Sequence, residues 1–146
     1  MTSKIAKGGA FQRWCKKWVE DNYPGACVHN EVSSSKAYFD KKTKEIKYFS
    51  HRNDILGCID LIAIIPDCKV VFIQATLDTG VHKRLKDMVA VPWCHDHCIV
   101  QLWQDKGGGR KVVKQLRQAG DVSELLNVAE IIRGKLVGMD KENLFR

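Results

Sequence analysis

Three polar residues interrupt two consecutive apolar runs of the sequence. Asp60 lies within the run 58–64, and Gln74 and Thr76 lie near the end of the run 70–76. A lone carboxylate in an apolar strand is costly unless it is paired or bound to a metal. Gln74 and Thr76 are two residues apart, so in a strand both side chains point to the same face. If the runs are antiparallel neighbours, the three side chains meet at one end of a sheet.

Such a meeting point would collect oxygen atoms of several kinds. Asp60 supplies a carboxylate, Gln74 an amide oxygen, Thr76 a hydroxyl and Ala75 a main-chain carbonyl. These ligands suit Mg²⁺ or Mn²⁺, and Mg²⁺ usually keeps several waters and completes its shell with phosphate. A metal of this kind polarises a phosphate and activates water. The alternative is that Asp60 is a satisfied structural acid at a strand end, and the spacing alone favours neither interpretation.

The surrounding pattern predicts an α/β fold with a mixed central β-sheet flanked by helices. A helix with one apolar stripe from Phe11 to Trp18 ends at 22–25, a basic helix covers about 81–90, and a final helix covers about 121–134. Seven further segments have the alternation or the continuous apolar runs of strands: 26–32, 36–40, 45–50, 58–65, 70–76, 97–103 and 111–117.

Two details of this prediction concern burial. We expect the hairpin strands 36–40 and 45–50 to be half-buried, because their apolar residues alternate with lysines. The runs 58–65 and 70–76 are nearly all apolar, which is typical of strands covered on both faces. A strand, basic helix and strand in sequence indicate a crossover connection within one sheet.

Composition places limits on the class of protein. The chain has 146 residues, which fits a single domain over 1–146 with a core at about 7–118. Its net charge is +7, and a basic excess favours polyanionic partners, chiefly nucleic acid. No run of 18 apolar residues exists, so no membrane partner is expected. The first residues lack the apolar core of a signal peptide, and we expect a cytoplasmic protein.

The segment from Asp54 to Lys86 resembles the core of the PD-(D/E)XK nucleases. An Asp (Asp60) precedes a short apolar strand, a hairpin leads to an apolar strand ending in Gln74-Ala75-Thr76, and Gly80 precedes a basic helix. The pattern is most similar to the archaeal Holliday junction resolvases and their phage and bacterial relatives. The likeness covers roughly the first hundred residues, because Lys7-Gly8 also matches the opening of the family's first helix.

The resemblance implies a restriction-endonuclease-like core and Mg-dependent hydrolysis of phosphodiester bonds in DNA, including branched DNA. The family's metal-binding Glu is Gln74 here, and its charge-stabilising Lys is Thr76. The acid usual in the first helix falls at or near Gln12. The metal ligands implied are therefore Asp60, Gln74 and the Ala75 carbonyl, a set weakened by the loss of charge. Asp54 or Glu31 could supply a missing carboxylate.

Several basic residues are candidates for contact with nucleic acid. By the same resemblance, Arg52 lies in a polar loop over the scissile phosphate, where His51 could move protons. The resemblance also sets Lys7 at the opening of the first helix, where it adds positive charge. The basic helix offers three further cations, for which a solvated helix face is the alternative: Lys83, Arg84 and Lys86. Family members that cut junctions are dimers, so a homodimer is possible here.

The cluster of Cys94, His95, His97 and Cys98 carries four potential zinc ligands. They lie within five residues, so we expect a turn that enters a strand rather than a zinc site. Three hypotheses remain open from the sequence. The first is a metal-dependent endonuclease, and the second is a nucleic-acid-binding module that has lost cleavage. The third is a protein-binding regulator.

Overall fold

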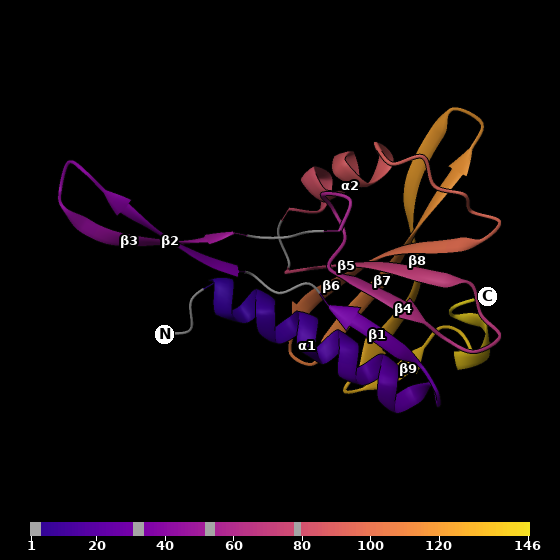
Figure 1. The fold of residues 1–146 in the computed structure, drawn as a ribbon. Helices are drawn as coiled ribbons and strands as arrows, with labels where there is room; N and C mark the ends of the chain where they lie inside the picture. The colour runs from indigo at the N-terminus through magenta and orange to yellow at the C-terminus, as the bar shows by residue number, and fades with distance from the viewer. Residues whose placement is uncertain (1–3, 31–33, 52–54, 78–79) are drawn as a thin grey trace.

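The computed structural model describes residues 4–30, 34–51, 55–77 and 80–146 (Figure 1). Within these ranges no helix is both long and apolar enough to cross a membrane. The elements in chain order are α1 (Lys4–Asn22), β1 (Cys27–Asn30), β2 (Ser34–Asp40), β3 (Glu45–His51), β4 (Leu61–Ile64), β5 (Val70–Thr76), α2 (Val81–Val89), β6 (Cys98–Gly107), β7 (Arg110–Ala119), β8 (Val122–Ile132), β9 (Lys135–Val137) and a short 3-10 helix (Lys141–Asn143).

The described residues form one mixed sheet and one separate hairpin. The sheet has seven strands in the order β1-β4-β5-β6-β7-β8-β9, and β2 pairs with β3 apart from it. Strands β5 and β6 are parallel and are connected through α2, whereas the other neighbours in the sheet are antiparallel. The predicted class, a mixed α/β fold with helices beside a central sheet, is therefore confirmed.

The two helices cover opposite faces of the sheet. Residues of α1 such as Cys15 and Val19 pack with Ile73 and Trp103 in one buried cluster, which we call the α1-side cluster. Met88 of α2 packs with residues such as Cys58, Val100 and Leu102 in a second group, the α2-side cluster. Because side chains alternate along a strand, odd-numbered residues of β5 belong to the first cluster and even-numbered residues face α2.

The predicted helix over 121–134 is wrong, because this segment is strand β8, paired antiparallel with β7. Leu125 lies opposite Leu116 in the α2-side cluster, whereas Ala129 lies opposite Val113 in the α1-side cluster. A β-bulge places one extra residue in β8 between them and reverses the alternation. Leu125 and Ala129 are four residues apart in sequence, which is the spacing of a helix face, but in β8 they lie on opposite faces of the sheet.

Two expectations about burial are also wrong. In the β2–β3 hairpin Tyr38 and Ile46 are exposed rather than half-buried, because no other layer of the described structure covers this hairpin. In β4 the side chain of Ile64 is 58% exposed and Ile62 is only half-buried. The α2 side of β4 is thus open, whereas Leu61 and Ala63 are fully buried on the α1 side.

Candidate functional site

The hairpin of β4 and β5 brings Asp60 next to Gln74. The register pairs Leu61 with Ile73, and Asp60 directly precedes this pair. The main-chain N–H of Asp60 donates to the Ile73 carbonyl at 3.0 Å, and Asp60 Oδ2 accepts a hydrogen bond from the N–H of Ala75 at 2.9 Å. The Asp60 side chain is 1% exposed. Its carboxylate therefore lies against the main chain of β5 and satisfies a buried N–H there.

The side chain of Gln74 binds the main-chain carbonyl of Ala75, the residue whose N–H binds Asp60. Its Nε2 donates to the Ala75 carbonyl at 3.3 Å, and the side chain is fully buried. Gln74 Oε1 is buried and has no hydrogen-bond partner in the described part of the chain. A buried acceptor without a partner costs about 1–3 kcal/mol. Turning the amide by 180° would instead aim Oε1 at the Ala75 carbonyl, an arrangement that a cation between the oxygens would stabilise.

Two further polar side chains lie at the carboxyl end of the parallel pairing between β5 and β6. Thr76 of β5 is opposite Gln104 of β6, and both are buried. By alternation they share the α2 face with Gln74. In open α/β sheets, ligands bind at the carboxyl ends of the strands. Gln104 was not among the predicted site residues, although a polar residue just after the apolar run 97–103 repeats the pattern that singled out Gln74 and Thr76.

The negative charge of Asp60 affects the pKa of Cys15 in α1. Burial raises the pKa of the Cys15 thiol well above its usual value, and the negative charge of Asp60 raises it further. Gln12 lies one helical turn before Cys15 and is half-buried. Asp60 thus lies beside the β5 main chain at a point near both Gln74 and the helix that carries Gln12.

Those basic residues predicted to contact nucleic acid that the structure describes lie on α2 and α1. Lys83 and Lys86 are exposed on α2 and Arg84 is half-buried; the helix begins soon after the end of β5. Lys7 lies in α1, but its side chain is outside the described residues. Three other candidates fall wholly outside the described ranges: Glu31, Arg52 and Asp54.

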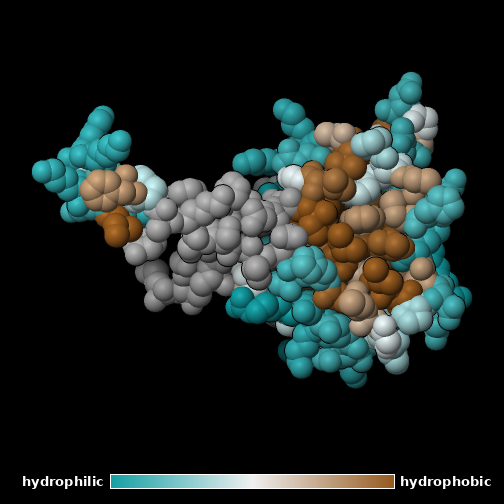
Figure 2. Space-filling model, in the orientation of Figure 1, coloured by the Kyte–Doolittle hydropathy of each residue, from teal (hydrophilic) through white to brown (hydrophobic). Residues whose placement is uncertain are grey.

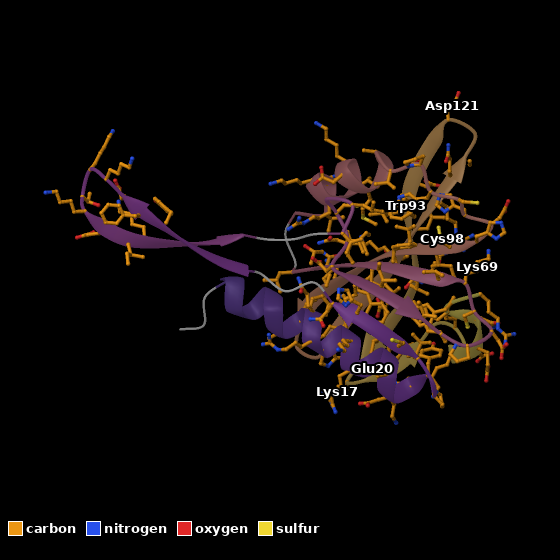
Figure 3. All side chains as sticks on the ribbon, viewed as in Figure 1. Lys17, Glu20, Lys69, Trp93, Cys98 and Asp121 are labelled. Carbon is orange, nitrogen blue, oxygen red and sulfur yellow. The ribbon has the colours of Figure 1, made fainter. Side chains whose placement is uncertain are left out.

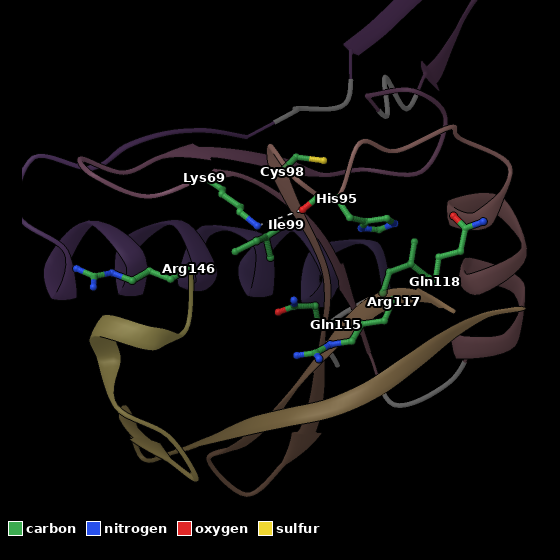
Figure 4. A pocket seen from close by; sticks show the side chains of 9 residues that line it. Lys69, His95, Cys98, Ile99, Gln115, Arg117, Gln118 and Arg146 are labelled. Atoms are coloured by element: carbon green, nitrogen blue, oxygen red, sulfur yellow. Dashed lines mark hydrogen bonds between the residues drawn. The ribbon is translucent and has the colours of Figure 1, made fainter. Parts of the chain in front are cut away.

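Two surface hollows lie away from Asp60. One of about 230 Å³ is basic, and Lys69, His95, Arg117 and Arg146 are among its lining residues (Figure 4). Lys69 Nζ donates to the His95 carbonyl there at 3.2 Å. Figure 3 shows where two of the lining residues, Lys69 and Cys98, lie on the whole molecule. The other, of about 550 Å³, lies between α2 and the β7–β8 turn. Neither is lined by Asp60 or by the polar residues at the end of β5.

The segment with Cys94 and Cys98 forms the turn that the sequence predicts. The N–H groups of His97 and Cys98 both donate to the Cys94 carbonyl at 3.0 Å, and β6 begins at Cys98. The Cys98 thiol donates to the same carbonyl, and burial raises its pKa. The Cys94 carbonyl therefore accepts hydrogen bonds from His97 and Cys98, and these bonds close the turn.

The donor set at Asp60 allows a metal site of the simplest kind. Among the described residues no group of three or more His, Cys, Asp and Glu side chains is placed to hold an ion. Mg²⁺ in proteins is often held by one or two carboxylates, with waters and substrate phosphates completing the shell. One carboxylate, the Ala75 carbonyl and the unpartnered oxygen of Gln74 fit the lower limit of that description.

Comparisons with protein-family models, with curated proteins and with solved structures found no match to this chain.

Proposed function

We propose that this protein is a metal-dependent DNA endonuclease of the PD-(D/E)XK type, similar to a Holliday junction resolvase. The observation that carries the proposal is the convergence of the Asp60 carboxylate and the Gln74 amide on the main chain of Ala75. The order α1, β1, β4, β5, α2, β6 also supports it, because the resemblance requires an Asp before a short strand, a hairpin and then a basic helix. The restriction-endonuclease-like core is part of this proposal.

In this proposal Mg²⁺ or Mn²⁺ is held by Asp60, the Ala75 carbonyl and Gln74. The ion, when bound, would polarise a phosphodiester and activate water. Asp60 supplies the negative charge of the site, and Gln74 contributes a neutral oxygen. Thr76 can hydrogen-bond to a water or a phosphate, but it carries no positive charge. We therefore expect weak metal binding that depends on the phosphate of the substrate.

A second candidate is a nucleic-acid-binding module of the same fold without cleavage. The specific observation in its favour is that Asp60 Oδ2 is buried and already accepts the Ala75 N–H. Neutral Gln74 and Thr76 stand where the resemblance requires a carboxylate and a cation. In this case Asp60 is a structural acid, and the basic surface alone carries the function.

DNA, including branched DNA, is the proposed partner, and a homodimer is the proposed assembly. The net charge of +7 favours a polyanion. The open side of β4 and β5 supports self-association: Ile64 and Val70 are exposed there, and apolar side chains gather on this face in Figure 2. Contiguous apolar surface on a soluble protein often marks an interface. A cytoplasmic location stays a prediction.

A cleavage assay separates these functions. Four-way junction, duplex and single-stranded DNA are incubated with the protein in Mg²⁺, in Mn²⁺ and in a chelator. We expect metal-dependent cutting, with preference for the branched substrate, and its loss in Asp60→Asn. Asp67→Asn is the matched control, because Asp67 is an exposed acid in the turn of the same hairpin and has a positive φ that Asn tolerates. Binding without cutting would favour the module, and no binding at low salt would exclude both.

A further inference from the structure

Strands β2 and β3 form an arm that projects from the body of the protein (Figure 1). We define the arm as residues 34–51, of which the side chains of 38–47 are described. Its strands pair with each other and, among the described residues, with no strand of the central sheet. An isolated two-stranded hairpin is marginally stable in water, because neither face has a layer to pack against. A second surface is therefore needed to order it firmly.

The tip of the arm presents an apolar pair to solvent. Phe39 and Ile46 are directly opposite each other in the register, so their side chains share one face. They are 59% and 63% exposed. Tyr38 is also exposed and lies on the other face, opposite Lys47. Large apolar side chains gathered at a projecting tip indicate a contact surface rather than a folding core.

The charge of the tip identifies the kind of surface. Lys41, Lys42 and Lys44 are exposed, and none of them forms an ion pair within the described part of the chain. The carboxylate of Asp40 is bound to other groups of the tip. Its Oδ2 pairs with Lys47 Nζ at 3.0 Å, and its Oδ1 accepts the Lys42 N–H at 2.9 Å. Glu45, the first residue of β3, is the remaining carboxylate at the tip. The tip is therefore basic around an apolar pair.

We propose that this arm enters the major groove of duplex DNA, with the lysines on phosphates and Phe39 and Ile46 against sugars and base edges. The major groove of B-DNA is about 12 Å wide and admits a two-stranded β-ribbon. A second copy of this chain is a poorer partner, because its net charge of +7 repels a basic tip. The inference rests on the DNA-binding part of the proposed function and is independent of cleavage.

The test compares two triple substitutions by their salt dependence. The arm variant is Lys41→Gln, Lys42→Gln and Lys44→Gln. The control variant removes three exposed cations from the β8–β9 turn, from β9 and from the 3-10 helix: Arg133→Gln, Lys135→Gln and Lys141→Gln. Each lysine that contacts a phosphate contributes about 0.9 to the slope of log K against log salt. We expect the arm variant to lose about 2–3 in slope on duplex DNA, and the control variant to keep the slope of the wild type.

A second variant, Phe39→Ser with Ile46→Ser, tests the apolar pair and should weaken duplex binding at least tenfold with an unchanged salt slope. Both arm variants should keep the urea midpoint of the wild type, because the arm lies outside the buried clusters.

If wild type binds DNA and the arm variants bind as the control does, the arm inference fails while the proposed function stands. If they lose self-association in sedimentation and keep DNA binding, a second copy occupies the arm and the inference is overturned. If wild type binds no DNA, the proposed function itself has failed.

Discussion

Replacing Asp60 separates its structural role from its chemical role. In Asp60→Ala the buried N–H of Ala75 loses the acceptor that lies 2.9 Å away. A hydrogen bond to a charged group contributes about 1.5–3 kcal/mol, and removing one partner also leaves a desolvated donor. Relief of the buried charge offsets part of this loss. We therefore expect Asp60→Ala to lower the free energy of unfolding by about 2 kcal/mol, and Asp60→Asn, which keeps an acceptor oxygen, by about 1 kcal/mol or less.

Urea denaturation measures both values. With a slope of about 1–3 kcal/mol per molar for a small protein, a loss of 2 kcal/mol moves the midpoint by about 1 M. Asp67→Ala on the exposed turn of the same hairpin is the control and should change the free energy of unfolding by less than about 0.5 kcal/mol. An Asp60→Ala midpoint equal to that of the wild type would mean that the carboxylate does not hold β5, and the reasoning about its position would be refuted.

Three other predictions follow from the same geometry. Gln74→Glu should speed metal-dependent cleavage, because it adds a carboxylate beside Asp60; a slower rate in a single-turnover assay would contradict this. The thiolate absorbance of Cys15 should appear at lower pH in Asp60→Asn, because a nearby negative charge has been removed, and an unchanged titration would place the carboxylate elsewhere. Hydrogen bonds from Lys47 and from the Lys42 N–H lower the pKa of Asp40, so the stability it contributes is complete above its unfolded pKa and is lost as the pH falls through the lower folded value. The Lys42 amide proton should report this titration by NMR with a midpoint below the ordinary pKa of an Asp side chain, and a midpoint at or above the ordinary value would exclude the interaction.

The parts of the fold that sequence alone predicted were those with one dominant signal. The continuous apolar run of β5 and the short turn before it are typical of a hairpin with β4, and this was enough to bring Asp60 beside Gln74. The basic helix was recognisable between Gly80 and Pro92 because both residues interrupt regular structure. The contact between Asp60 and the Ala75 N–H was not predictable, since it depends on the placement of one side chain against a main-chain group.

The parts that were missed depend on neighbours that a local pattern cannot reveal. Leu125 and Ala129 have the sequence spacing of a helix face, and only the pairing with β7, with its bulge, shows that they face different clusters. The lysine alternation around Tyr38 and Ile46 indicated strands correctly, but whether another layer covers a hairpin is decided by tertiary structure. Gln104 carried a signal in the sequence, because it follows an apolar run, but its position opposite Thr76 depends on the register of β6 against β5.

Binding of Mn²⁺ tests most directly the claim that Asp60 and Gln74 form one metal and phosphate site. Free Mn²⁺ is measured by electron paramagnetic resonance during titration of the protein with uncleaved junction DNA present. We expect one site in wild type, tighter binding in Gln74→Glu and loss of the site in Asp60→Asn, with Asp67→Asn equal to wild type. Equal binding by wild type and Asp60→Asn would contradict the account.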